Sequence, residues 1–352
     1  MHVLIAGLGA IGQRHARNLR SLLGPGLRLS AYRVRRLRGV VTPGLELDRS
    51  QDVEATLGIE SYDDLGAALR AKPDVAIIAN PSSAHVETAL ACVRAGCHLL
   101  VEKPLSDSLE GIDELAGEVE RRGLVAMVAY QLRFHPSFER FQQIVSSGEL
   151  GNLLSVRATV GEYLPNWHRY EDYRAMYAAR AELGGGVVLT QIHEYDYLYA
   201  LFGMPQKLYA LGGHLSDLDI NVEDTASALM HCTVSGRPLP VHIAQDYLQR
   251  PTSRACEVVG DRGKAMLDFA AGTVSLWRDG GEPVIDRLET FDRNELYLSE
   301  MRHFLGCVGA NRGPLVDLRE GKKSLEIALA VKRSIESGTV VDVAVGDRVH
   351  VA

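Results

Sequence analysis

The chain has 352 residues, a length that suggests about two domains and allows a large core. Hydrophobic residues make up 46% of it and charged residues 24%, which is the balance of an ordinary globular protein. The net charge of −7 argues against a general nucleic-acid surface, and the absence of an 18-residue apolar run argues against a transmembrane helix.

The cysteines indicate a reducing compartment. They are five in number, they are scattered, and they include no CxxC pair, which fits buried thiols better than disulfides or a zinc site. The chain enters a predicted strand directly at its N-terminus, so we expect no signal peptide, a cytoplasmic location and no metal. The cysteines are Cys92, Cys97, Cys232, Cys256 and Cys307.

The first residues predict a dinucleotide-binding βαβ unit. A short apolar run, 3–6, leads directly into G-x-G-x-x-G, and residues 13–23 are rich in helix formers with apolar residues on one face. In this motif Gly7 permits the turn, Gly9 lets the backbone approach a pyrophosphate, and Gly12 lets the helix pack closely on the strand. The helix N-terminus would then offer N–H groups and a positive dipole end to the phosphates. The motif comprises Gly7, Leu8, Gly9, Ala10, Ile11 and Gly12.

The second strand, predicted over 27–32, ends about 20 residues beyond the glycine turn. An acidic residue at this point usually binds the ribose 2′-hydroxyl of NAD, but here the chain reads Tyr32-Arg33-Val34-Arg35-Arg36. An arginine fork pairs with a 2′-phosphate, so Arg33 and Arg36 predict a preference for NADP(H), with NAD(H) as the alternative. The first 45 residues contain no acidic residue, which indicates either a solvated basic face or a phosphate-binding corner. Their eight arginines are Arg14, Arg17, Arg20, Arg28, Arg33, Arg35, Arg36 and Arg38.

Alternating strands and helices continue to residue 130 and predict a parallel sheet with both faces covered. Residues 41–56 are expected to form a polar, irregular connection. Strands are predicted over 59–62, 74–79, 98–101 and 124–129, with helices over 63–70, 83–95 and 105–122. The strand at 74–79 ends in Asn80-Pro81-Ser82-Ser83-Ala84-His85, where doubly wound sheets place ligands, although Ser83 is equally well an N-cap. The strand at 98–101 runs into Glu102-Lys103-Pro104, a charged pair that is costly unless it faces a cleft, before an X-Pro bond open to the cis form.

The pattern changes after Tyr130 and predicts an α+β domain with a large, mostly antiparallel sheet. Helices are expected over 136–147, 187–202, 294–310 and 318–337, and residues 164–183 form an aromatic, charged stretch suited to a polar pocket wall or to an ordinary packed loop. Ser235-Gly236 and 260–263 are typical of hairpin turns. The expected domains are therefore 1–130 and 131–352. Strands are predicted over 153–163, 208–215, 224–234, 239–248, 255–259, 265–269 and 273–277.

Five motifs in this order resemble the glucose–fructose oxidoreductase/inositol dehydrogenase family, called Gfo/Idh/MocA, over nearly the whole chain. The resemblance implies a Rossmann domain, then a sheet that lines the substrate site and forms dimers or tetramers. It also implies NAD(P)-dependent oxidation or reduction of a sugar, polyol or related hydroxyl compound. The motifs are the glycine turn, Asn80-Pro81, Glu102-Lys103-Pro104, Arg133-Phe134-His135-Pro136, and Gly184-Gly185-Gly186 followed by His193.

By family position, Lys103 stabilises the developing alkoxide and His193 exchanges the hydroxyl proton, a task for which an imidazole has a suitable pKa. They come from different domains, so the cleft between the domains is the expected place of reaction. The expected cofactor contacts beyond the glycine turn are Arg33, Arg36, Asn80, Pro81, Ser82, His85, Glu102, Lys103 and Gln131. The expected substrate contacts are Lys103, Tyr130, Arg133, Trp167, Arg169, Tyr173 and His193.

One position departs from the family pattern. Many members carry an Asp one helical turn before the catalytic histidine, where this chain has Thr190, which cannot supply a carboxylate. Asp196 lies three residues after His193 and is expected to substitute in part. Because Thr190 occupies the position of this Asp, we include it among the expected catalytic residues. The sequence does not show which group assists His193 in proton transfer.

Two other functions remain open. A glycosidase of the same fold would use bound NAD in an internal redox cycle and would show no net change in cofactor absorbance. A non-catalytic NADP-sensing regulator is the third reading, against which the retained Glu102-Lys103-Pro104 argues. Residues 161–165 and 193–197 look like a subgroup that acts on sugars, including nucleotide-linked or amino sugars.

Overall fold

The computed structural model describes residues 1–34, 39–42, 44–288 and 291–343. These fall into two compact units, and each is discontinuous in the sequence. Unit 1 contains Met1–Gln131, His168–Gly185 and Arg293–Lys322. Unit 2 contains Leu132–Trp167, Gly186–Asp292 and the described residues from Lys323 onward.

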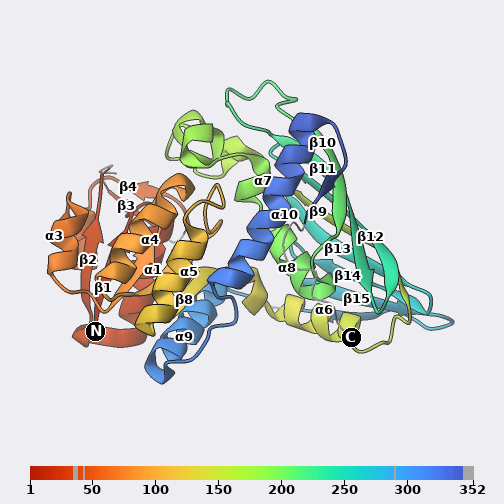
Figure 1. Ribbon diagram of the computed structural model, residues 1–352, viewed down its shortest axis with the longest axis horizontal. Helices are drawn as coiled ribbons and strands as arrows, with labels where there is room; N and C mark the ends of the chain where they lie inside the picture. Colours follow the sequence, from red (N-terminus) through yellow and green to blue (C-terminus); the bar gives the residue numbers. More distant parts are fainter. Residues whose placement is uncertain (35–38, 43, 289–290, 344–352) are drawn as a thin grey trace. The chain divides into compact units, whose positions relative to one another are not determined.

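Unit 1 contains a six-stranded parallel sheet in the order β5-β2-β1-β6-β7-β8. The strand order reverses between β1 and β6, and right-handed crossovers therefore place α1 and α4 on opposite faces. Figure 1 shows α4 and α5 side by side along one of these faces. The strands are β1 (His2–Ala6), β2 (Arg28–Tyr32), β5 (Ile59–Tyr62), β6 (Val75–Ile78), β7 (His98–Glu102) and β8 (Ala126–Ala129). The helices are α1 (Ala10–Leu23), α3 (Leu65–Arg70), α4 (His85–Arg94) and α5 (Ile112–Arg122).

The predicted parallel sheet is confirmed, and its strands are buried because both faces are covered. The prediction of an irregular connection over 41–56 is wrong. That segment holds a small hairpin and a short helix, α2, whose N-terminus is capped by Asp52 accepting from the Ala55 N–H at 2.8 Å. The hairpin strands are β3 (Val40–Val41) and β4 (Leu47–Asp48), and α2 is Val53–Leu57.

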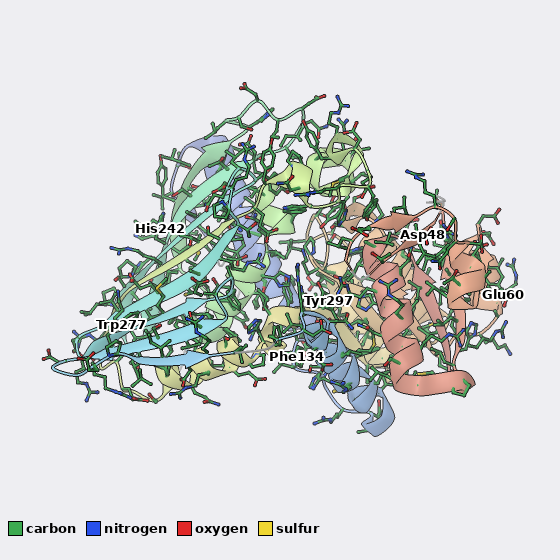
Figure 2. All side chains as sticks on the ribbon, turned by 180° about the vertical axis from the view of Figure 1, so that it is seen from behind. Asp48, Glu60, Phe134, His242, Trp277 and Tyr297 are labelled. Carbon is green, nitrogen blue, oxygen red and sulfur yellow. The ribbon has the colours of Figure 1, made fainter. Side chains whose placement is uncertain are left out.

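A helix from the end of the chain, α9 (Asn294–Ala310), completes unit 1 by packing on α1. Asn294 Oδ1 accepts from Arg14 at 3.2 Å, and Asn294 Nδ2 donates to Asn18 Oδ1 at 2.9 Å. The Arg14 guanidinium lies 4.7 Å from the centre of the Tyr297 ring, which is labelled in Figure 2. The helix that carries the glycine turn is thus held from its outer side.

Unit 2 contains a nine-stranded sheet in the order β16-β15-β14-β13-β9-β12-β11-β10-β17. Among the described strands of this sheet, only β9 and β12 pair in parallel, so the predicted mostly antiparallel sheet is confirmed. Ser235 and Gly236 have φ of 49° and 74°, as the two-residue hairpin between β11 and β12 requires. The strands are β9 (Leu153–Gly161), β10 (Lys207–Gly213), β11 (Thr225–Val234), β12 (Arg237–Asp246), β13 (Ser253–Gly260), β14 (Gly263–Asp268), β15 (Thr273–Arg278), β16 (Val284–Arg287) and β17 (Val341–Asp342).

Helices pack on one face of this sheet, as Figure 1 shows for α7 and α8. The alternation along β12 reflects this one-sided cover, because Val241, Ile243 and Gln245 are buried whereas His242 is partly exposed. Among the described residues, no helix is long and apolar enough to cross a membrane. The helices are α6 (Pro136–Ser146), α7 (Val187–Thr190), α8 (His193–Phe202) and α10 (Leu318–Ser337).

The single helix predicted over 187–202 is wrong in its middle, where the chain breaks between α7 and α8 at Gln191 (φ −98°, ψ 37°). The Gln191 side chain donates to the Asp246 backbone carbonyl at 3.0 Å. The Gln191 backbone carbonyl accepts from the Gln245 side chain at 2.8 Å. These hydrogen bonds to β12 favour the break over a continuous helix. His193 consequently begins a helix of its own.

Candidate active site

The three glycines of the turn after β1 have different surroundings. Gly7 has φ +96°, and a Cβ there would lie 2.5 Å from the Ala79 carbonyl oxygen. A Cβ on Gly12 would lie 2.1 Å from the Gly7 carbonyl oxygen, whereas a Cβ on Gly9 would meet nothing within 4 Å. The fold itself therefore needs Gly7 and Gly12, while the bare backbone at Gly9 borders open space, as close approach of a ligand requires.

The N-terminus of α1 is prepared for an anion. Within the described residues, no side chain caps it, and its first turn carries no acidic residue. Its free N–H groups and positive dipole end suit a pyrophosphate. With the open space at Gly9, these residues fit a dinucleotide.

A matched pair of substitutions separates these roles. Gly9→Ala should leave the thermal unfolding midpoint within about 2 °C of the parent and weaken NADH binding at least about tenfold, because its Cβ occupies only ligand space. Gly12→Ala should lower the midpoint by several degrees, because its Cβ overlaps backbone. Calorimetry and fluorescence titration with NADH measure both, and unchanged NADH affinity in Gly9→Ala would contradict this placement of the pyrophosphate.

At the end of β2, Arg33 is buried rather than offered to a ligand surface. Its side chain is 4% exposed, and Nη1 donates to Glu54 Oε1 at 2.8 Å. Other arginines of the acid-free stretch also have partners within unit 1: Arg17 donates to the Val41 carbonyl, Arg20 to the Leu57 and Gly58 carbonyls, and Arg28 pairs with Glu60. Most of the described arginines that were expected to form a phosphate-binding corner are therefore engaged in contacts within the protein. Arg35, Arg36 and Arg38 lie outside the described residues.

The segment after β6 places a polar acceptor at the reversal of strand order. Asn80 Nδ2 donates to Thr88 Oγ1 at 2.9 Å, while its buried Oδ1 meets no donor among the described residues. That oxygen is suited to a ligand hydroxyl. Pro81 follows it, and Ser82 is buried at the start of a short 3₁₀ turn.

His85, expected to contact the cofactor, instead holds two loops together. It is 1% exposed, and its ring nitrogens lie 2.9 Å from the carbonyl oxygens of Asn80 and Pro104. Burial lowers the pKa of His85, and the two carbonyls only partly offset this effect. Because both nitrogens are engaged by backbone, the side chain supports the site and does not face it.

Contacts within unit 1 also hold Glu102 and Lys103, the charged pair at the end of β7. Glu102 Oε1 accepts from His15 Nε2 at 2.7 Å, and Glu102 Oε2 lies 3.3 Å from the Lys103 backbone nitrogen. Burial opposes ionisation of Glu102, but the hydrogen bond from His15 and the charges of His15 and Lys103 outweigh it, so the pKa of Glu102 is lowered. Lys103 follows as the first residue beyond β7, and its bond to Pro104 is cis. Gln131, 8% exposed, lies just beyond β8 in this unit.

In unit 2, Thr190 and His193 lie on either side of the helix break and are both 3% exposed. Thr190 Oγ1 donates to the Gly186 carbonyl at 2.8 Å and accepts from the Tyr247 hydroxyl. Tyr247 stands just after β12, so Thr190 is joined to the sheet by a neutral hydrogen bond. Together with the Val188 N–H, which donates to Glu223 Oε1 at 3.3 Å, this hydrogen bond holds the segment before His193 in place.

Asp196 is bound by other side chains of unit 2, and its expected part in proton transfer beside His193 stays a prediction. Its oxygens accept from Arg133 at 2.6 and 3.0 Å and from Ser324 Oγ at 3.1 Å, and its side chain is 1% exposed. Arg133, expected to line the substrate pocket, has a side chain only 10% exposed that binds this carboxylate. The pair anchors α8, as does the buried pair of Glu194 with Arg254 at 2.9 Å.

The remaining expected substrate residues are divided between the units. Tyr130, in unit 1, is completely buried. Arg169 is exposed and Tyr173 partly exposed, both in the unit 1 segment of short turns. In unit 2, Trp167 packs edge-on against Tyr247 with 5.3 Å between ring centres.

Three residues that sequence reasoning missed shape these sites: Glu54, His15 and Tyr247. A signal existed for Glu54, because Asp52-Val53-Glu54-Ala55 has the capping residue and acidic first turn of a helix start. His15 is completely buried in α1, where its ring contacts Glu102 and packs edge-on against Tyr297, and the sequence carries no signal for either partner. Tyr247 reaches Thr190 only through sheet register, for which the sequence carries no signal.

Family models match most of the chain. Residues 1–130 match the oxidoreductase family with an NAD-binding Rossmann fold (GFO/IDH/MocA), and residues 138–266 match the GFO/IDH/MocA C-terminal domain. The chain is 30% identical to trans-1,2-dihydrobenzene-1,2-diol dehydrogenase of Bos taurus over 82% of its length and 84% of that protein's. It is 25% identical to myo-inositol 2-dehydrogenase of Thermotoga maritima over 96% of both chains.

Solved structures share the whole fold. The WlbA dehydrogenase from Bordetella pertussis, in complex with NADH and UDP-GlcNAcA, superposes with a TM-score of 0.79 over 98% of this chain and 99% of that one, at 20% identity. The family models, the curated relatives and the two sheets therefore agree. The chain belongs to the GFO/IDH/MocA oxidoreductase family and is a dehydrogenase that acts on CH–OH groups.

Proposed function

We propose that this dehydrogenase oxidises a secondary hydroxyl of a polyol or sugar derivative, or reduces the corresponding ketone, with Lys103 and His193 serving that one reaction. The main observation in support is the position of Lys103. It follows β7 directly, next to Glu102, whose side chain is held by His15. The inositol and diol named for the relatives support the substrate class. Nucleotide-linked and amino sugars are the finer candidates.

The chemistry divides between these side chains. When bound, a nicotinamide dinucleotide takes up the hydride that leaves the carbinol carbon. As the C–H bond breaks, His193 accepts the hydroxyl proton, the oxygen keeps the O–H electron pair, and the C=O bond forms. The Lys103 ammonium stabilises negative charge on that oxygen while the proton departs. In the reverse direction His193 returns the proton.

The prediction of NADP(H) as the favoured cofactor stays a prediction. It depends on Arg33 and on Arg36, of which the first is paired with Glu54 and the second lies outside the described residues. What the family match supports is the coarser statement, a nicotinamide dinucleotide in an NAD-binding Rossmann fold.

A screen of sugars, polyols, uronic acids and nucleotide sugars with NAD⁺ and NADP⁺ tests the activity. We expect substrate-dependent formation of reduced cofactor, followed by its near-ultraviolet absorbance. Hydrolysis of a glycoside with no net absorbance change would assign the internal redox cycle of a glycosidase instead. Cofactor binding with no turnover of any kind would favour a regulator, for which Thr190 is the relevant departure.

One face of the nine-stranded sheet carries no helix from the described part of the chain, and this face supports the proposal of a homodimer or homotetramer. Its strands expose large apolar side chains, including Leu211 and Leu229, which are 60% and 55% exposed. The parent should therefore elute as an oligomer in size-exclusion chromatography with light scattering, and Leu229→Lys should shift it toward the monomer. Leu109→Lys, at an exposed leucine of unit 1, is the control. A monomeric parent would exclude this interface.

A cytoplasmic location is proposed from the thiols. All five cysteines are buried and none is in a disulfide. Burial raises the pKa of Cys232 to about 11, so its thiol stays protonated and unreactive at neutral pH. Such cysteines suit a reducing compartment.

A further inference from the structure

The fold supplies a carboxylate to the end of β2, although the sequence there has none. Glu54 lies in the first turn of α2, 21 residues beyond Arg33, and its Oε1 accepts from Arg33 Nη1 at 2.8 Å. The Tyr32 carbonyl, one residue earlier, accepts from the Gly7 N–H at 2.9 Å. The Arg33–Glu54 pair is thereby fixed beside the glycine turn, at the strand end where Rossmann folds bind the adenosine ribose.

The two members of the pair differ in what they offer a ligand. The Arg33 side chain is 4% exposed, whereas the Glu54 side chain is 34% exposed. The backbone of Arg33 is also held, because its N–H donates to the Tyr62 carbonyl at 2.9 Å. The carboxylate is therefore the more accessible group of this pair, and its hydrogen bond with the guanidinium fixes its position.

A ribose 2′-hydroxyl and a 2′-phosphate interact with such a pair in opposite ways. The hydroxyl can donate to the carboxylate. A phosphate would meet like charge on Glu54, and Arg33 could reach it only by leaving a partner inside the protein. The two charges of the pair cancel, so the pair provides no net attraction for the additional phosphate.

We infer that Glu54, held by Arg33, selects NAD(H) over NADP(H), the reverse of the preference that the arginines in the sequence predict. This inference rests on the proposed function, because it assumes that a nicotinamide dinucleotide occupies the glycine turn. Arg33 is then a positioning residue for Glu54 and does not bind phosphate.

Fluorescence titration of the full chain with NADH and NADPH, without substrate, tests the inference. The parent should bind NADH at least about tenfold tighter than NADPH, a difference of about 1.4 kcal/mol in binding free energy. Glu54→Gln keeps an acceptor for Arg33 and removes the charge. It should reduce the NADH-to-NADPH affinity ratio by about tenfold or more, mainly by tightening NADPH.

Glu60→Gln is the matched control. Glu60 pairs with Arg28 at 2.9 Å within the same unit, both side chains are about half exposed, and Figure 2 labels Glu60. This variant should leave the affinity ratio unchanged. An equal or tighter affinity for NADPH in the parent, or an unchanged ratio in Glu54→Gln, would overturn the inference. The parent measurement is decisive even if Glu54→Gln does not fold, and failure of the parent to bind either dinucleotide would instead overturn the proposed function.

Discussion

Replacing Lys103 with methionine should lower kcat/KM for the oxidised polyol by about 10²–10³-fold, the usual effect of removing one charge-stabilising donor from a reacting oxygen. Methionine keeps most of the side-chain length and volume but cannot carry the ammonium charge. NADH affinity should change less than about threefold, because the glycine turn and the N-terminus of α1 remain intact. Steady-state kinetics and fluorescence titration measure these two quantities.

The fold should tolerate this change. The His15 hydrogen bond, which contributes more than Lys103 to the lowered pKa of Glu102, remains in the variant. Lys72→Met removes an exposed lysine from the same unit and should leave kcat/KM as in the parent. Parent-like turnover in Lys103→Met would remove Lys103 from the mechanism, whereas equal losses in both variants would indicate a general effect of charge.

The second large effect is expected at His193. Its replacement by asparagine should lower kcat by about 10²–10⁴-fold, which is the range for loss of a general base. The pH–rate profile should also lose the limb that depends on a neutral imidazole. NADH affinity should again stay close to the parent value, because the glycine turn and the N-terminus of α1 remain intact.

His242→Asn provides the control for His193. His242 lies on the partly exposed side of β12, where its ring contacts Ser227 Oγ at 2.9 Å, and it is labelled on the sheet in Figure 2. This variant should keep both kcat and the shape of the pH profile. A His193→Asn enzyme with the parent pH profile would show that another group moves the proton.

Local patterns in the sequence were sufficient to predict most of the fold. The apolar runs in unit 1 and the Ser235-Gly236 turn in unit 2 each specify their structure within a few residues, and the sheets follow from them. The predictions failed where tertiary contacts decide the conformation. Gln191 interrupts a helical pattern because β12 offers it hydrogen-bond partners, and Asp52 starts a helix only five residues long.

In the candidate site, too, the features that depend on local sequence were predictable and those that depend on tertiary contacts were not. Gly9 follows from a motif whose geometry is local, and the structure gives it the open space that the motif requires. Arg33 and Asp196 show the limit, because the sequence presents a charge and does not show which opposite charge the fold brings to it. The partners, Glu54 and Arg133, are separated from them by 21 and 63 residues. An ion pair between such distant residues gives each member a partner that the sequence does not show.

The most direct test of the account is the path of the hydrogen itself. The full chain should be incubated with NAD⁺ or NADP⁺ and a panel of polyols and sugars that carry deuterium on their carbinol carbons, and the cofactor analysed by mass spectrometry. We predict deuterium on the reduced nicotinamide and a ketone product in equal amount, with both lost in Lys103→Met. A parent protein that binds the dinucleotide but transfers no deuterium to it from any member of the panel, or that cleaves a glycoside without net reduction, would contradict it.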